Sequence, residues 1–323
     1  MPRIISLLPS ATESLCALGA GNLLVGRSHE CDFPAEVAQL PVLTAQSTPP
    51  ELALDPAAID ASVRQQLASG ISLYSVNEPL LRALRPDLIL TQDLCEVCSI
   101  DLKTVRRIAD SLSPRPEVLS LNPQTFEGVL DDIYSIGRAV GFEKQAVDTV
   151  ARLRERMFAA AEFVNAFEDG PSVVFLEWTD PLFVGGHWTP QLIERAGARH
   201  PLNAPIPKEN AGAAAGPQMA ERVAGKSIRV SSQVVEALNP DALIIAPCGM
   251  SLAQSRGCAQ SLAARPWFQN LKAVRTGRVA LVDGSQMFNR PGPRLVDAFE
   301  FLVGWLNTRP ELIPRDFPWE PMR

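Results

Sequence analysis

Helix-type spacing of hydrophobic positions continues longest between Glu143 and Phe167, a stretch without glycine or proline. Apolar side chains recur there at intervals of three and four residues, and charged side chains fall largely on the other face. Gly141 stands just before this stretch and Asp169-Gly170-Pro171 just after it, so both ends carry helix-boundary signals. A helix of this length spans about 37 Å. We therefore predict one long helix that separates two lobes.

The chain on the two sides of this helix repeats one pattern. Ala83 to Leu90 and Ala237 to Ile245 each read as a helix end, a Pro-Asp turn and an apolar strand, followed by a loop that contains cysteine. Arg3 to Leu8 and Ser172 to Leu176 form a second matching pair, since each is an apolar strand that leads into a helix. The two halves are thus predicted to be copies of one α/β plan.

Strand-type and helix-type patterns alternate in both halves without tandem hairpins, which favours parallel sheets. The predicted fold class is α/β, with two Rossmann-like lobes that have parallel sheets, are joined by a single long helix and enclose a ligand cleft. Loops at the carboxyl ends of the strands would surround this cleft. The expected bounds are residues 1–141 for the N-terminal lobe, 142–168 for the helix and 169–323 for the C-terminal lobe.

Local signals add further expectations. Ser10 and Glu13 fit a capping box at the start of the first helix. Pro205 to Gly225 lacks periodicity and reads as a long loop, and Arg278 to Val282 reads as the last strand. His200, which precedes a proline, is expected on the surface.

Length and charge restrict the partners. The 323 residues can hold two domains of ordinary size. A net charge of −6 offers no basic face for nucleic acid or an anionic membrane, and no apolar run is long enough to insert into a bilayer. The first residues lead directly into a strand without a leader-like segment, so we expect a cytoplasmic protein. We also expect a monomer. If a leader had been removed, the periplasm or another extracytoplasmic location is the alternative.

Three predicted loops concentrate soft or polar ligands: His29 to Asp32, Asp93 to Cys98, and Cys248 to Met250. The spacing of Cys95 and Cys98 lets two thiolates hold one metal ion or form a redox pair, and His29 with Cys31 could complete a tetrahedral site. These four residues are the candidate metal ligands. Ordinary thiols that are buried or line the cleft are the alternative.

Aromatic side chains supply a second candidate site. They make up 6% of the chain, yet several fall in or near predicted loops at the strand ends. Flat side chains that line a cleft suit a large planar ligand, through stacking and burial. Packing at the edge of the core is the alternative for any one of them. The aromatic candidates are Tyr74, Trp178, His187, Trp188, Trp267 and Phe288.

Catalytic motifs are absent from the sequence. It has no GxSxG elbow, no Walker loop and no HExxH, and His29 with Cys31 is the closest approach to a base and nucleophile pair. We therefore expect a binding protein and no enzyme. The alternative is a metal-binding or thiol-dependent enzyme that uses the same cysteines, histidine and cleft.

Several motifs of the chain resemble those of a known family. They are Arg3 to Glu13, Leu18 to Gly21 with Leu24 to Gly26, Leu84 to Ile89, Gly277 to Val279, and Arg290 to Arg294. These motifs resemble the helical-backbone class of periplasmic-binding-like proteins, above all the vitamin B12 (cobalamin) binders that serve ABC importers, whose relatives carry iron-siderophores and haem. The resemblance covers nearly the whole chain except Pro205 to Gly225, and it implies the two-lobed fold with ligand in the cleft.

The resemblance implies cobalamin or a related corrinoid as the ligand, stacked on aromatic side chains. His29 or a cysteine could supply an axial ligand to cobalt, because imidazole and thiolate both suit such a metal. The full set of candidate ligand-binding residues is Pro9, Ser10, His29, Cys31, Tyr74, Gln92, Asp93, Trp178, His187, Trp188, Cys248, Met250, Phe288 and Arg290.

The chain also departs from this class. Members that serve a transporter carry a surface glutamate on each lobe, seven residues before the Pro-Asp pair, which meets arginines of the permease. Pro79 and Gln233 occupy these positions here, with Glu78 and Glu236 nearby. This difference argues against docking onto an ABC permease of that kind. The loops with His29 and Cys95 resemble a branch without leaders, whose role the resemblance leaves open.

Overall fold

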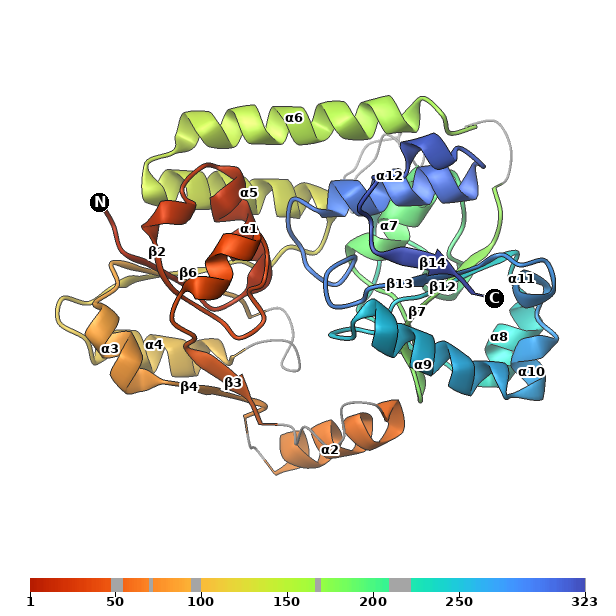
Figure 1. Cartoon of the computed structure of the whole chain (residues 1–323), viewed down its shortest axis with the longest axis horizontal. Coiled ribbons are helices and arrows are strands. Elements are labelled where there is room, and N and C mark those ends of the chain that lie inside the picture. The colour runs from red at the N-terminus through yellow and green to blue at the C-terminus, as the bar shows by residue number, and fades with distance from the viewer. Residues whose placement is uncertain (48–54, 70–71, 94–99, 166–169, 209–221, 323) are drawn as a thin grey trace. The chain divides into compact units, whose positions relative to one another are not determined.

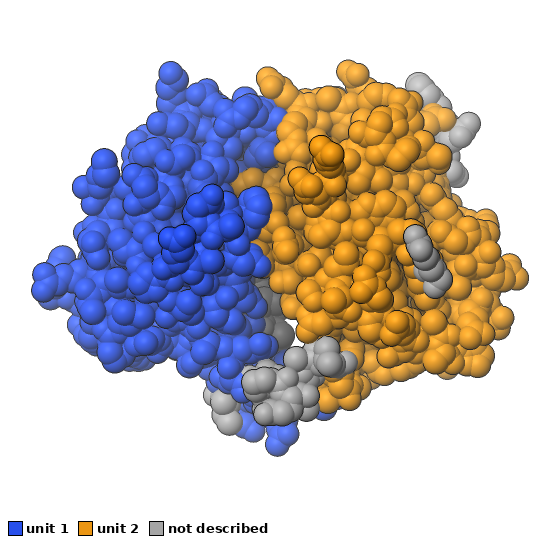
Figure 2. Space-filling model, in the orientation of Figure 1, with its two compact units in different colours: residues 1–52, 61–123, 127–153 blue, residues 53–60, 124–126, 154–323 orange. Residues whose placement is uncertain are grey.

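A computed structural model describes residues 1–47, 55–69, 72–93, 100–165, 170–208 and 222–322. The chain divides into two compact units, shown in different colours in Figure 2. Unit 1 comprises Met1–Leu52, Ala61–Pro123 and Glu127–Leu153, and unit 2 comprises Ala53–Asp60, Gln124–Phe126 and Arg154–Arg323. The lobe bounds and the cleft that the sequence predicts stay predictions.

Unit 1 is built on a parallel sheet of four strands in the order β2-β1-β5-β6. Helices α1 and α5 lie on one face, and α3 and α4 on the other (Figure 1). The buried side chains of Ile5, Leu81, Ile89 and Val105 form part of its core. The elements are β1 (Ile4–Ser6), α1 (Pro9–Ala17), β2 (Leu24–Arg27), α3 (Glu78–Leu84), β5 (Leu88–Thr91), α4 (Leu102–Asp110), β6 (Glu117–Ser120) and α5 (Phe126–Val140).

A short antiparallel ribbon of β3 (Thr44–Gln46) and β4 (Tyr74–Val76) also lies in unit 1. Helix α2 (Pro56–Ala68) falls between these strands in sequence and has no buried residue. Short 3-10 turns occupy Gly21–Leu23 and Ala35–Gln39.

Unit 2 has a mixed sheet of six strands in the order β11-β8-β7-β12-β13-β14. Strands β7, β12 and β13 are parallel, while β8, β11 and β14 run antiparallel to their neighbours. Helices α7 and α12 lie on one face, and α8 to α11 on the other (Figure 1). The strands are β7 (Val173–Thr179), β8 (Leu182–Val184), β11 (Ile228–Arg229), β12 (Ala242–Ile245), β13 (Val279–Val282) and β14 (Trp319–Pro321).

The helices of unit 2 are α7 (Trp188–Arg195), α8 (Ser232–Leu238), α9 (Leu252–Ala263), α10 (Pro266–Gln269), α11 (Lys272–Arg275) and α12 (Leu295–Leu306). Shorter 3-10 turns occupy Pro201–Asn203 and Pro310–Leu312.

Two sequence predictions about this sheet were wrong. The sheet was expected to be parallel throughout, but it is mixed, and β7 and β8 form a hairpin around the turn Asp180-Pro181. Val279–Val282 is not the last strand, because β14 adds to its free edge. These added strands are only two or three residues long, too short for a hydrophobic period to reveal them.

The predicted long helix is present as α6 (Glu143–Ala161), which ends six residues earlier than expected (Figure 1). The N–H groups of Phe163 and Val164 bond to carbonyls only three residues back, so the regular helix stops. The guanidinium of Arg309 lies 4.3 Å from the centre of the Phe163 ring, a tertiary contact that holds this turn in place. Phe167, the expected end, lies outside the described residues.

The predicted capping box at Ser10 and Glu13 was also wrong. Helix α1 begins two residues earlier, at Pro9, with Leu8 and not Ser10 as the N-cap, and Leu8 makes no side-chain bond. Proline suits this first position because it lacks the N–H that a helix start leaves unbonded. Ser10 is consequently buried within the first turn, where its carbonyl accepts a bond from the Ser14 hydroxyl.

The loop expected at Pro205 to Gly225 has structure at its two ends. There β9 (Ile206–Pro207) pairs with β10 (Arg222–Val223), and residues 209–221 lie outside the described residues. Arg222 holds the end of the loop through an ion pair with Glu194 at 2.8 Å. This contact joins residues 28 positions apart, so no local pattern predicts it.

The predicted internal repeat is confirmed in the geometry at two matching helix ends. Helices α3 and α8 both terminate in a left-handed residue, Arg85 with φ 45° and Asn239 with φ 46°. A left-handed C-cap is a common way to stop a helix, although glycine is the usual residue there. Both halves thus make the same turn before Pro-Asp.

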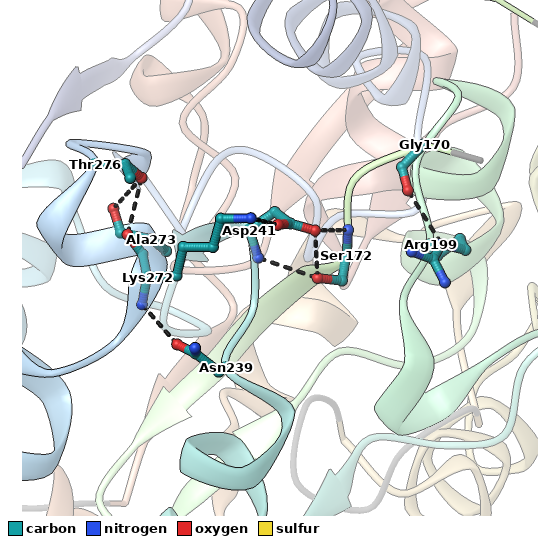
Figure 3. A network of polar contacts seen from close by, with 8 residues as sticks. All are labelled: Gly170, Ser172, Arg199, Asn239, Asp241, Lys272, Ala273 and Thr276. Atoms are coloured by element: carbon teal, nitrogen blue, oxygen red, sulfur yellow. Dashed lines mark hydrogen bonds and ion pairs between the residues drawn. The ribbon is translucent and has the colours of Figure 1, made fainter. Parts of the chain in front are cut away.

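The aspartates of the two Pro-Asp pairs play the same part. Asp87 accepts the Arg3 N–H at 2.7 Å in unit 1, and Asp241 accepts the Ser172 N–H at 2.8 Å in unit 2. Each carboxylate thereby fastens the start of the neighbouring parallel strand. Asp241 also bonds the Ser172 hydroxyl and the Lys272 ammonium, as Figure 3 shows. The bond with Lys272, followed by those with Ser172, lowers the pKa of Asp241 to about 2.

We expect Asp241→Asn to lower the free energy of unfolding at pH 7 by about 1–2 kcal/mol, because a charged acceptor with three bonds is lost. Asp87→Asn should lower the free energy of unfolding by less, since the Asp87 carboxylate accepts one bond within the described residues, from the neutral N–H of Arg3. The wild-type advantage is present above the ordinary aspartate pKa of 3.8 and is lost as the pH falls towards 2. Urea unfolding between pH 7 and 2.5 measures it. Asp148→Asn on the exposed face of α6 is the control, and an equal loss there would contradict the prediction.

Candidate ligand-binding site

The loops that follow β12 and β13 in unit 2 are joined to each other. Because β7, β12 and β13 are parallel, their carboxyl ends lie at one edge of the sheet. There the Ser285 N–H donates to the Met250 carbonyl at 2.9 Å, and the Asn289 side-chain amide donates to the Ala246 carbonyl at 3.2 Å. These bonds connect two of the loops in which the sequence places candidate ligand-binding residues.

Trp188 and Phe288 meet inside unit 2. The Trp188 indole N–H donates to the Phe288 carbonyl at 2.6 Å, across 100 positions of sequence. The Phe288 ring packs edge-on against Phe175 at 4.9 Å between centres. Trp188 is 6% exposed and Phe288 1% exposed, so both support the site from behind. Neither offers a free face for stacking in this conformation.

His187 lies against this pair in a rare backbone conformation. Its φ of 54° and ψ of −120° belong to a region that essentially only glycine enters freely. The imidazole stacks on Trp188 at 5.5 Å between centres, and its Nδ1 lies 3.2 Å from the Gln124 Oε1. Burial, followed by the charge of Lys226, lowers the pKa of His187, so the ring is neutral at pH 7. Phe288 is also left-handed, with φ 64°.

The remaining candidates of unit 2 adjoin the same loops. Trp178, near the end of β7, is half-buried and donates from its indole N–H towards the carbonyls of Pro56 at 3.2 Å and Asp180 at 3.1 Å. The N–H of the half-buried Cys248 donates to the carbonyl of Glu177, the residue before Trp178. The buried Arg290 reaches the Ser285 hydroxyl at 3.4 Å, and Met250 is buried as well.

In unit 1 the structure brings His29 and Tyr74 together. The His29 N–H donates to the Thr44 hydroxyl oxygen at 3.0 Å, and Nδ1 lies 2.6 Å from the same oxygen. The ribbon of β3 and β4 carries both Thr44 and Tyr74, which places the Tyr74 ring 5.7 Å from the imidazole. Burial, followed by the charge of Arg27, lowers the pKa of His29. Its buried Nε2 bonds to no other described residue.

Four other candidates lie at the carboxyl ends of β1 and β5. Pro9 and the buried Ser10 begin α1, directly after the turn that follows β1. Gln92 is buried and Asp93 is exposed, and the Asp93 N–H donates to the Asn122 Oδ1 at 2.6 Å. Unit 1 therefore places these residues along the expected edge of its sheet.

The candidate metal ligands are only partly described. Cys31 is fully buried, with the Thr12 hydroxyl 3.0 Å and the Ser28 hydroxyl 3.1 Å from its sulfur. Within the described ranges, no three His, Cys, Asp or Glu side chains are grouped to hold a metal ion. Cys95 and Cys98 lie outside those ranges. The metal-binding and thiol-enzyme interpretations therefore stay predictions.

Two hollows lie elsewhere in unit 2, beside the turn between β7 and β8. Their volumes are about 350 and 200 Å³, and Thr179, Asp180 and Arg265 line both. Neither is lined by a ligand-binding residue that the sequence predicted. The smaller one also borders Pro56, whose carbonyl accepts the bond from Trp178.

Sequence reasoning missed the residues that hold the candidates in place. Gln124 and Asn289 are the partners of candidate loops in unit 2, and Thr44 is the partner of His29 in unit 1. Each partner lies in another segment of the chain. A short polar side chain in a loop gives no local signal of which distant loop it will meet.

Comparison with known proteins decides the family. Residues 4–285 match the family described as periplasmic binding protein. The chain belongs to the periplasmic binding protein family. This agrees with the resemblance in the motifs and with the mixed α/β fold. The expectation that the chain is not an enzyme stays a prediction.

Relatives of this periplasmic binding protein include transporter components. It is 25% identical over 305 residues to the uncharacterized ABC transporter substrate-binding lipoprotein YvrC of Bacillus subtilis (strain 168), covering 93% of this chain and 78% of that one. A periplasmic heme binding protein from Pseudomonas aeruginosa shares the fold with a TM-score of 0.68 and 20% identity, over 100% of this chain and 96% of the other. The periplasmic vitamin B12 binding protein BtuF of Vibrio cholerae has a TM-score of 0.64 and 18% identity, over 96% and 98%.

The names of these relatives bear on location. They are periplasmic proteins or a lipoprotein, so the comparisons give no support to the cytoplasmic expectation and agree with the extracytoplasmic alternative. None of the helices in the described part of the chain combines the length and apolar composition that a bilayer crossing requires.

The positions that bear on permease docking are at the starts of α3 and α8. Pro79 and Gln233 are exposed, and so is Glu236. Glu78 forms an ion pair with Arg107 at 2.6 Å. The expectation that the chain does not dock onto an ABC permease of that kind therefore stays a prediction.

Proposed function

We propose that this periplasmic binding protein is the extracytoplasmic substrate-binding component of an ABC-type importer. Its ligand would be a large, flat metal chelate, with cobalamin or another corrinoid as the first candidate and heme as the second. Family membership supports the binding role, and the names of the relatives support the importer, the location and both chelates.

The observation that carries the proposal is the strained pair at His187 and Phe288. Two residues other than glycine hold left-handed backbone conformations, and the buried bond from Trp188 to the Phe288 carbonyl connects them. Strain of this kind costs of order 1–3 kcal/mol per residue, persists only where the surrounding structure imposes it, and clusters at ligand-binding and active sites. Here it fixes a half-exposed imidazole, backed by an indole, as a flat surface on unit 2.

Within unit 1, His29 and Tyr74 are the candidates for contact with a chelated metal. The neutral imidazole of His29 has a second nitrogen without a partner among the described side chains, and the Tyr74 ring lies close by. Imidazole and phenolate are both axial ligands of chelated metals in proteins. His29 is therefore the proposed axial ligand, and Tyr74 the second choice.

Titration with hydroxocobalamin and with hemin tests the proposal, followed by absorbance and by calorimetry. We expect saturable binding of at least one of them. Trp178→Ala should weaken it about 10-fold, because a stacking surface on the ligand side is lost. His29→Ala should change the absorbance spectrum of the complex if the imidazole reaches the metal.

Trp305→Ala is the matched control, because Trp305 stacks on Phe301 in α12 and is not among the candidate residues. It should lower stability and leave affinity unchanged. The absence of heat and of any spectral change with both chelates would overturn the proposal.

A further inference from the structure

The larger hollow of unit 2 is a separate candidate binding site. Its volume of about 350 Å³ falls within the range of small-molecule pockets. The turn between β7 and β8, the end of β11, the start of α8 and Arg265 after α9 line it, and it is open to solvent. Its lining residues are Thr179, Asp180, Pro181, Leu182, Arg229, Val230, Ser231, Ser232 and Arg265.

The hollow is lined by two arginines and one carboxylate, so one positive charge has no acidic partner among the lining residues. Arg265 pairs with Asp180 at 2.6 Å, which accounts for the carboxylate. Arg229 makes no side-chain hydrogen bond or ion pair with any residue in the described part of the chain. In contrast, Arg222 and Arg256 of the same unit each have a carboxylate partner. One positive charge is thus left over in the hollow of a chain that is acidic as a whole.

Hydroxyl donors accompany the charge. Ser231 is the N-cap residue of α8, but its side chain makes no capping bond, and no other partner for it is found among the described residues. Ser232 has only a long bond of 3.4 Å to the Gln233 side chain. Arg229 is placed by the pairing of β11 with β8, where it stands opposite Phe183. Its position therefore depends on a strand and not on a free loop.

We propose that this hollow binds a small anion with a phosphate or carboxylate group. The forked guanidinium of Arg229 would bind two oxygens of the anion, and the Ser231 hydroxyl would bind a third. Arg265 would add charge from the other side while it keeps its pair with Asp180. The anion could be free, or it could be the acidic edge of a larger ligand held by unit 2.

Calorimetric titration of the whole chain with inorganic phosphate and with citrate, at low ionic strength, tests this site. We expect saturable binding of one anion per chain. Arg229→Gln should weaken it about 10- to 100-fold, because a charge-assisted pair of bonds is removed. Arg229→Lys should restore part of the affinity, since it keeps the charge without the fork. Arg275→Gln removes an equal charge from the exposed end of α11 and should leave affinity unchanged.

Repeating the titration after saturation with hydroxocobalamin or hemin separates the two sources of the anion. Unchanged phosphate binding indicates a site for a free anion, and competition indicates that the chelate's own acidic group occupies the hollow. In both cases the anion, whether free or part of the chelate, binds in the hollow. Failure of both anions to bind saturably, or equal losses in Arg229→Gln and Arg275→Gln, would overturn it. This outcome does not depend on whether either chelate binds.

Discussion

Replacing His187 with glycine is expected to give a more stable protein than replacing it with alanine, by about 1–2 kcal/mol. Both substitutions remove the imidazole, its stacking on Trp188 and its contact with Gln124. They differ in the backbone alone, because only glycine takes φ 54° with ψ −120° without strain. At an ordinary position the order is reversed, and alanine is the more stable by roughly 0.5–1 kcal/mol. Urea unfolding of the two variants at pH 7 measures the difference.

The affinity of the same two variants for a chelate should separate the effect of the backbone strain on stability from the role of the imidazole in binding. If the strained turn presents the imidazole to a chelate, both variants should bind hydroxocobalamin or hemin about 10- to 100-fold more weakly than the wild type, since the flat contact is gone. The glycine variant would then combine the higher stability with the same loss of binding. Gly257 in α9 provides the control, because a Cβ there meets open space. Gly257→Ala should stabilise the helix and leave affinity unchanged. An alanine variant as stable as the glycine variant would show that His187 is not strained.

Acid should destabilise the native protein through His200. The side chain is only 1% exposed, which makes the expected surface position of this residue wrong. Its Nε2 accepts the Phe175 N–H at 3.3 Å, so the ring proton is on Nδ1, which has no partner among the described residues. Burial lowers the pKa of His200 to about 4, against an ordinary value of 6.5. Between these two pH values the unfolded chain binds a proton that the folded chain does not.

The stability of the wild type relative to His200→Gln should therefore fall by about 3 kcal/mol between pH 7 and pH 4, and should change little below that. Glutamine retains an acceptor for the Phe175 N–H and does not titrate. The wild type must be compared with a His200 variant, because the titration of Asp132 raises the stability of both proteins as the pH falls and would mask the effect of His200. Burial, followed by the charge of Asp131, raises the pKa of Asp132 to about 7, so its protonation favours the folded state as the pH falls. Urea unfolding of both proteins at several pH values measures the difference, and parallel curves would contradict the prediction.

Much of the fold could be predicted because it depends on local pattern. The helix end, Pro-Asp turn and apolar strand predicted around Pro86 are present as the end of α3, the turn at Arg85 and β5. The matching turns at Arg85 and Asn239 follow from the repeated Pro-Asp signal. The alternation of apolar runs and amphipathic helices was enough to predict two α/β halves. Each of these features depends on burial or backbone geometry within about ten residues of the chain, so a local pattern is enough to predict it.

The candidate site was predictable only as a set of loops. Parallel strands end at the same edge, so the sequence could place Cys248 and Phe288 near that edge of unit 2, and His29 near the edge of unit 1. It could not place His187, which follows the antiparallel strand β8. It could not show that Trp188 is buried behind His187, because burial of an aromatic residue in a loop depends on the loops around it.

The sequence by itself determined the family, the α/β plan with its repeated Pro-Asp turns, and the long helix α6. Only the tertiary structure decided the antiparallel strands at the edges of the second sheet and the strained turn at His187. It also decided the unbalanced charge at Arg229. The physical reason is the range of the interactions. Hydrophobic period and turn chemistry act between near neighbours, whereas these features arise from contacts between segments that are far apart along the chain.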